Sequence, residues 1–246
     1  MDHAGGYNSR QYTHMIGAAM SVNDCRSAIP VLAIDGPSAS GKGTVAALVA
    51  KALGFHYLDS GAIYRVTAHA ALNRGVDPGD EAALAAMARG LNLRFDGVEV
   101  YLDCQPVGDA IRTEEAGRAA SRIAALPALR SALLELQHAF RKPPGLVTDG
   151  RDMGSVVFPD ATVKVFLTAT AEERARRRYN QLIEKGFAAN LAALEQDLRE
   201  RDARDASRAS APLHQAVDAH LLETTTLTIA QAVDRVLGWY RGAKPT

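Results

Sequence analysis

Cysteine is almost absent from this sequence, because Cys25 and Cys104 are the only two among 246 residues. A disulfide framework needs more cysteines at closer spacing, so the pattern favours a chain that folds in a reducing compartment. No apolar run approaches the roughly 18 residues of a membrane-spanning helix, and the first residues do not form a charged region followed by an apolar signal core. We therefore expect a soluble, cytoplasmic protein that does not bind membranes.

Net charge is absent as well, because 28 lysine and arginine residues balance 28 aspartate and glutamate residues. Without a global positive field we expect no binding to nucleic acid, and any site for an anion must be built locally from a few arginines. Apolar residues make up 47% of the chain, which is enough to bury a sizeable core as one domain with an insert. We expect this domain to be a monomer.

The first 28 residues have no hydrophobic periodicity and mix Gly, Asn, Ser and His. We interpret residues 1–28 as a flexible N-terminal extension, with initiation at Met20 as the alternative. The folded domain is then expected over residues 29–246.

From residue 30 onward, short apolar runs alternate with segments of helical period. This alternation predicts an α/β fold with helices packed on a largely parallel sheet. Capping patterns at Thr170 and Thr228 predict helix starts, and Gly186 and Gly238 predict helix ends. The predicted buried strands cover residues 31–35, 55–58, 146–149, 163–167 and 219–223.

One segment departs from this rhythm. Apolar and polar residues alternate over 91–95 and again over 98–102, with Asp96-Gly97 between the two runs. This pattern predicts an antiparallel hairpin with one buried face. Since the main strands are apolar throughout, we place the hairpin in a small α+β insert of about residues 80–125.

A glycine-rich segment follows the first predicted strand and precedes a helical pattern. Its form, G-x-x-x-x-G-K, is that of a phosphate-binding loop, in which backbone amides and a helix N-terminus hold phosphate oxygens and the lysine supplies a positive charge. The usual hydroxyl residue directly after the lysine is replaced by glycine, so magnesium coordination by the next residue, Thr44, stays open. The residues predicted to bind ATP are Gly36, Pro37, Ser38, Ala39, Ser40, Gly41, Lys42, Gly43 and Thr44.

Further motifs follow in order along the chain, and together with the loop they resemble the bacterial cytidylate kinases, which are nucleoside monophosphate kinases of the P-loop type. The resemblance covers residues 29 to about 240. It implies a five-stranded parallel core, an insert that binds the nucleoside monophosphate and a mobile lid, placed at about residues 174–190. It also implies transfer of the γ-phosphoryl group of ATP to CMP and dCMP with Mg²⁺. The motifs that carry it are Asp59-Ser60-Gly61-Ala62-Ile63-Tyr64-Arg65, Ile111-Arg112-Thr113-Glu114, Asp149-Gly150-Arg151-Asp152-Met153-Gly154, residues 156–160 and residues 200–205.

Phosphoryl transfer depends mostly on positioning and on cancelling charge, so arginines are the expected site residues. The resemblance assigns CMP binding to Ser60, Arg65, Ser121, Arg130, Arg151, Asp152, Arg201, Asp205 and Arg208, and catalysis to Lys42, Arg151 and Arg208.

Within that set, Ser121, Arg130 and Asp152 resemble residues that read cytosine. The spacing of Arg201, Asp205 and Arg208 predicts one helix face, for which a solvated charged surface is the alternative.

The metal ligands stay open in the sequence. Asp35 and Asp149 end two predicted strands at the edge where a nucleotide would bind, and either carboxylate could order water on magnesium. Capping a helix or bracing a loop is the alternative for both, and Thr44 has the same ambiguity. The dense run formed by Arg174 and residues 176–178 lies at the expected lid, but four neighbouring side chains cannot all face inward from one helix.

Two other functions compete with this interpretation. The phosphate loop concerns only the donor, so a kinase for UMP, dTMP or a metabolite such as shikimate has the same loop. A nucleotide-dependent switch that hydrolyses ATP slowly has it too, but such a protein needs no pocket for a second nucleotide.

Overall fold

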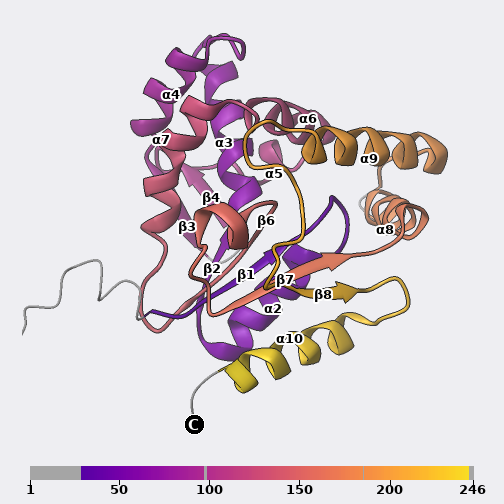
Figure 1. The fold of residues 1–246 in the computed structure, drawn as a ribbon. Coiled ribbons are helices and arrows are strands. Elements are labelled where there is room, and N and C mark those ends of the chain that lie inside the picture. The colour runs from indigo at the N-terminus through magenta and orange to yellow at the C-terminus, as the bar shows by residue number, and fades with distance from the viewer. Residues whose placement is uncertain (1–28, 97–98, 185, 244–246) are drawn as a thin grey trace, which may run out of the picture.

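The computed structural model describes residues 29–96, 99–184 and 186–243, so the predicted N-terminal extension lies outside the described residues (Figure 1). Its centre is a parallel sheet with the strand order β2-β6-β1-β7-β8. All five predicted strands are confirmed, with bounds shifted by at most one residue at either end. They are β1 (Val31–Asp35), β2 (His56–Asp59), β6 (Leu146–Gly150), β7 (Val163–Thr168) and β8 (His220–Glu223).

The central strand β1 is buried along its whole length and pairs with β6 on one side and β7 on the other. Alternate residues of β1 enter two separate cores: Val31 and Ala33 pack into one, and Leu32 and Ile34 into the other. A strand covered on both faces must be apolar throughout, which is why this one was visible in the sequence. All five strands run the same way, so their carboxyl ends meet at one edge of the sheet.

Helices cover both faces of the sheet. In Figure 1, α2 (Lys42–Leu53) and α10 (Ile229–Ala243) lie on one face, while α3 (Ser60–Asn73) and α7 (Pro127–His138) lie on the other. Two further helices, α8 (Ala171–Glu184) and α9 (Leu191–Ala206), pack together beside the carboxyl edge of the sheet. The remaining helical segments are α4 (Glu81–Arg89), α5 (Gly108–Ile111), α6 (Glu114–Ile123) and η1 (Met153–Val157).

The predicted helix starts are confirmed. The amide of Gln231 donates to Oγ1 of Thr228 at 3.3 Å, and the Thr228 amide donates back to the Gln231 side chain at 2.9 Å. Thr170 likewise accepts from the amide of Glu173, and α8 begins directly after it. These bonds satisfy amides that have no partner within the helix, and only the Thr228–Gln231 pair is reciprocal.

The two predicted helix ends have different outcomes. Gly186 follows α8 in the left-handed conformation, with φ of 80°, and its amide donates to the carbonyl of Ile183. Gly238 was predicted wrongly, because it lies inside α10. Its neighbours Leu237 and Tyr240 are buried in the core, and that burial outweighs the cost of about 1 kcal/mol for glycine in a helix.

The predicted hairpin is confirmed as β3 (Leu93–Asp96) and β4 (Glu99–Leu102), which pair antiparallel with Asp96 opposite Glu99. Gly97 and Val98 lie outside the described residues. A short third strand, β5 (Gln105–Pro106), extends this sheet. The apolar face of the sheet packs against α3. Throughout the described part of the chain, no helix is both long and apolar enough to cross a membrane.

Candidate active site

A cavity of about 390 Å³ lies at the carboxyl edge of the parallel sheet, between the phosphate loop and the helices α3, α6 and α9. Six acidic residues line it, against ten basic ones. The electrically neutral chain therefore concentrates positive charge at this one place, as an anion site requires. The basic residues are Lys42, Arg65, Arg112, Arg118, Arg130, Arg151, Arg178, Arg201, Arg204 and Arg208.

The predicted phosphate loop connects β1 to α2. Gly41 precedes α2 with φ of 92°, a left-handed conformation that favours glycine. Gly36 packs so closely against β7 that an added Cβ would lie 2.0 Å from the carbonyl oxygen of Leu167. Both glycines are therefore required by the path of the backbone, and this path places residues 38–44 of the loop along the cavity.

Within the loop, Lys42 donates to the carbonyl of Pro37 at 3.2 Å. Burial, followed by the nearby charge of Arg151, lowers the pKa of Lys42 to about 7. Oγ of Ser40 is buried and has no hydrogen-bond partner among the described residues. Polyphosphate bound here would supply both the negative charge and the missing partner.

The two strand-end carboxylates make different contacts. Oδ1 and Oδ2 of Asp35 accept from the amides of Met153 and Gly154, each at 2.8 Å, and Asp35 does not line the cavity. Burial nevertheless raises its pKa to about 6. These are the contacts of a carboxylate that braces a loop, which was the alternative left open by the sequence.

Asp149, by contrast, lines the cavity together with Thr44. Its Oδ1 accepts a hydrogen bond of 2.7 Å from the hydroxyl of Tyr57, and burial raises its pKa to about 6. The described residues contain no group of three or more His, Cys, Asp or Glu that could hold a metal ion. Magnesium in phosphoryl-transfer sites is commonly held by one or two carboxylates plus phosphate oxygens and water, so Asp149 with Thr44 fits such a site.

The start of α3 carries the residues predicted to bind the acceptor phosphate. Asp59 caps the helix by accepting from the amide of Ala62 at 2.9 Å, and its other oxygen accepts from Arg65 at 2.6 Å. Nε of Arg65 is buried without a hydrogen-bond partner in the described part of the chain. Ser60 donates to the carbonyl of Asp149 at 2.8 Å. The capping contact therefore orients a guanidinium that still has an unused donor.

Deeper in the cavity, Arg130 and Asp152 form an ion pair, with side chains 10% and 6% exposed. Arg130 also donates to the hydroxyl of Tyr64 at 3.3 Å. Burial raises the pKa of Asp152, and the charge of Arg130 opposes that rise. These two residues, predicted to read cytosine, thus lie together in a poorly solvated part of the site.

A second network is centred on Asp205, which is almost completely buried. It accepts from Arg151 at 2.7 Å, from Ser121 at 3.2 Å and from Arg208. Burial raises the pKa of Asp205, but the charges of Arg151 and Arg208 outweigh it, so the net shift is downward. The helix α9 ends at Ala206, so the expectation that Arg208 shares a helical face with Arg201 and Asp205 was wrong. It reaches the same cavity from the loop after the helix.

Among Arg151, Arg201 and Arg208, Arg201 forms the fewest hydrogen bonds with the described residues. Its Nε is buried and has no hydrogen-bond partner within the described residues. Burial, followed by the charge of Arg151, lowers its pKa to about 10. A guanidinium in this position would be stabilised by an anion or a hydroxyl that enters the cavity.

The arginine run of α8 divides into separate roles. Of this run, only Arg178 lines the cavity, and it pairs with Glu114 of α6, which lines the cavity as well. Arg174 donates to the carbonyl of Ser38 at 3.1 Å and pairs with Asp202, while Arg177 donates to the carbonyl of Ser40 at 2.9 Å. Arg176 is largely exposed. Two members of the run therefore hold the backbone of the phosphate loop.

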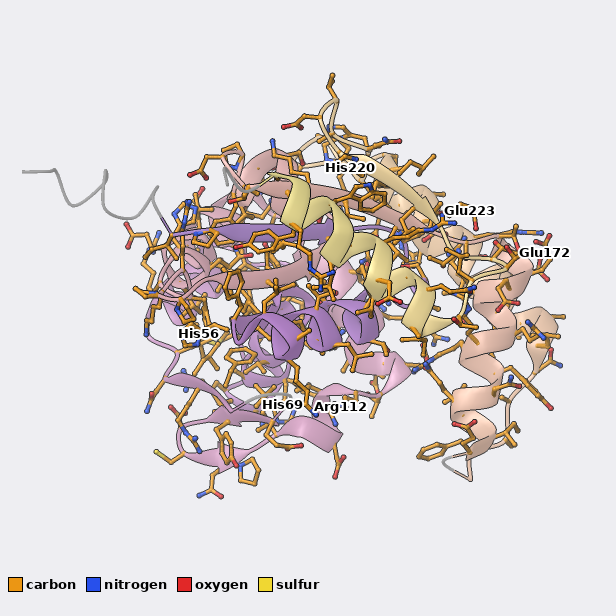
Figure 2. The ribbon with its side chains drawn as sticks, turned by 90° about the horizontal axis from the view of Figure 1, so that it is seen from below. His56, His69, Arg112, Glu172, His220 and Glu223 are labelled. Atoms are coloured by element: carbon orange, nitrogen blue, oxygen red, sulfur yellow. The ribbon has the colours of Figure 1, made fainter. Side chains whose placement is uncertain are left out.

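Sequence reasoning did not single out Tyr57 or Tyr64. Tyr57 lies two residues before Asp59, on the same face of β2, and this alternation was the available signal. No histidine of the described residues lines the cavity. Figure 2 shows His56 and His220 in separate parts of the molecule, and His220 stacks on Trp239 with ring centroids 4.5 Å apart.

A phosphate loop and an adjoining arginine-lined hollow with a buried polar pair define a nucleotide-dependent phosphotransferase. The chain belongs to the cytidylate kinase family, whose model matches residues 32–241. It is 60% identical to a cytidylate kinase of Bordetella bronchiseptica over 90% of this chain and all of that protein. It is also 60% identical to one from Chromobacterium violaceum and 57% identical to one from Nitrosomonas europaea, over 86% and 88% of this chain and 96% and 97% of those proteins.

Proposed function

We propose that this chain transfers the γ-phosphoryl group of ATP to CMP and dCMP, giving CDP or dCDP and ADP. The observation that carries the proposal is the continuity of one cavity from the phosphate loop to the Arg130–Asp152 pair. A donor site alone would need only the loop. The second, buried half of the cavity therefore indicates a site for a second ligand.

Lys42 is the residue of the donor loop that meets the β and γ phosphates in this proposal. Arg151 lies between the two halves, since Nη2 donates to Oγ of Ser38 at 2.7 Å and Nε donates to Asp205. A guanidinium at this junction can stabilise charge on the phosphoryl group as it moves. Arg208 forms an ion pair with the same Asp205 and adds a second positive charge.

The acceptor CMP would place its phosphate against Ser60 and Arg65, and its sugar near Arg201 and Asp205. The buried Nε donors of Arg65 and Arg201, which have no hydrogen-bond partner among the described residues, support this assignment. The base would meet Arg130, Asp152 and Ser121. Magnesium, held by Asp149 and Thr44 directly or through water, would neutralise charge on the phosphates of ATP.

The bounds of the insert at about 80–125 and of the lid at about 174–190 belong to this proposal. The ion pair of Arg178 with Glu114 supports a lid that meets the acceptor side when the cavity closes. The monomeric state and the cytoplasmic location stay predictions from composition.

The test is coupled detection of ADP release with ATP and Mg²⁺ and, in parallel, CMP, dCMP, UMP, dTMP, shikimate or no acceptor. We expect release to depend on CMP or dCMP, with slower turnover of UMP. Preference for another acceptor would replace the substrate assignment. Equal ATP turnover with and without any monophosphate would favour the nucleotide switch instead.

A further inference from the structure

Tyr57 connects a strand of the central sheet to the site without being part of the cavity wall. Its hydroxyl donates to Oδ1 of Asp149 at 2.7 Å, from β2 to the neighbouring parallel strand β6. The cavity is lined by Asp149 but not by Tyr57. The tyrosine therefore acts on the site through the carboxylate that it holds.

This pair stands directly against the phosphate loop. A Cβ added to Gly43 would lie 3.5 Å from the Tyr57 hydroxyl and 3.8 Å from each carboxylate oxygen of Asp149. No side chain of the loop separates them from its backbone. Asp149 is only 5% exposed. Few water molecules can therefore reach its carboxylate and replace a hydrogen bond that is lost.

The hydrogen bond distinguishes the two oxygens of Asp149. Oδ1 accepts from the tyrosine, and no other side chain of the described residues forms a hydrogen bond with this carboxylate. Oδ2 is then left for a ligand at the donor loop. A carboxylate fixed at one oxygen presents the other in a defined direction, whereas a carboxylate without that bond can rotate.

We propose that Tyr57 is a positioning residue for the donor, whose hydroxyl turns the free oxygen of Asp149 toward the magnesium ion that accompanies ATP. This inference rests on the proposed function only in taking ATP with magnesium as the donor. It does not depend on which acceptor the kinase uses. Its test can therefore be made in the absence of any acceptor.

The experiment compares wild type with Tyr57→Phe, which removes the hydroxyl and keeps the ring. Isothermal titration calorimetry measures ATP binding with excess Mg²⁺ and, separately, with EDTA. We expect binding of magnesium–ATP to weaken roughly five- to tenfold, about the effect of losing one typical hydrogen bond, and binding of metal-free ATP to stay unchanged. In turnover, the half-saturating Mg²⁺ concentration should rise while the KM for CMP stays the same.

Tyr101→Phe is the matched control. Tyr101 lies in the small sheet, where its ring packs under Arg94, and it does not line the cavity. This variant should leave both titrations unchanged. In an Asp149→Ala background, Tyr57→Phe should cause no further loss of magnesium–ATP binding, because the carboxylate through which it acts is gone.

Equal losses with magnesium and with EDTA would overturn the proposal, since they would mean that the hydroxyl supports the loop in general. Unchanged magnesium–ATP binding in Tyr57→Phe would overturn it as well. So would a further loss in the Asp149→Ala background. Loss of acceptor dependence in the turnover assay would instead count against the proposed function, and would leave the calorimetric result for Tyr57 standing.

Discussion

Arg130 donates to Oδ2 of Asp152, so the two residues assigned to the base edge of the acceptor pair with each other. Their side chains are almost completely buried, and each provides the other with a partner for a charged hydrogen bond. Cytosine offers an amino donor and a ring acceptor on one edge, which match a carboxylate and a guanidinium held side by side. Uracil presents the reverse pattern.

Asp152→Asn should lower the CMP-to-UMP ratio of kcat/KM, mainly by weakening CMP, since the amide can rotate and donate to the uracil carbonyl. An unpaired polar group at such an edge costs about 1 to 3 kcal/mol, so the ratio should fall roughly 10- to 200-fold. Parallel kinetics with both nucleotides measure it. Asp160→Asn, which breaks the pair with Arg141 outside the cavity, is the control. A proportional loss for both substrates would assign Asp152 to bracing alone.

Lys42→Met should lower turnover by several powers of ten and also make the unliganded protein more stable. The folded pKa of Lys42 is about 7, below the ordinary 10.5, so the unfolded chain binds the extra proton between these values. The stability cost of this lysine is therefore complete below pH 7 and declines as pH rises toward 10.5. Melting temperatures at pH 6.5 and 9 should show a larger gain for the variant at pH 6.5. A folded variant with near-normal turnover would contradict the role of the lysine.

Gly150→Ala should impair both stability and CMP binding. An added Cβ would lie 2.5 Å from Oγ of Ser60 and 2.8 Å from Cγ of Met153, so Ser60 must move. We expect a loss of about 1 to 3 kcal/mol in unfolding free energy and a roughly tenfold higher KM for CMP. Gly238→Ala is the matched change in α10, where nothing lies within 4 Å, and it should add about 0.5 to 1 kcal/mol with unchanged kinetics. A normal KM in a folded Gly150→Ala variant would remove Ser60 from the acceptor site.

Deletion of residues 1–27 should change the melting temperature and the activity little, because that stretch has no periodic apolar face to pack. Differential scanning calorimetry and steady-state kinetics on both proteins check this. A large drop in either quantity would show that the extension packs on the kinase domain.

The sequence predicted the centre of the main sheet well because β1 and β6 are buried along their whole length and begin as short apolar runs, whereas the edge strands β2 and β8 are partly exposed and carry a weaker pattern. It predicted β3 and β4 because one buried face imposes alternation, whereas β5 has only two residues and too little pattern to detect. The loop was recognisable because phosphate contacts come from backbone, which glycine spacing reports directly.

What stayed open were contacts between side chains distant in sequence. Periodicity could not decide that Asp35 binds two amides of η1 while Asp149 faces the cavity. Nor could it assign Arg178 to the cavity and Arg177 to the phosphate loop. Each outcome depends on what lies opposite the residue in space, and a single sequence carries no direct record of that.

The position of Arg151 has a thermodynamic consequence. One guanidinium is bonded to Ser38 on the donor side and to Asp205 on the acceptor side, so a ligand that shifts it toward one half changes its contacts in the other. We therefore expect the two substrates to bind with a coupling free energy. By linkage, the factor by which ATP alters the affinity for CMP equals the factor by which CMP alters the affinity for ATP.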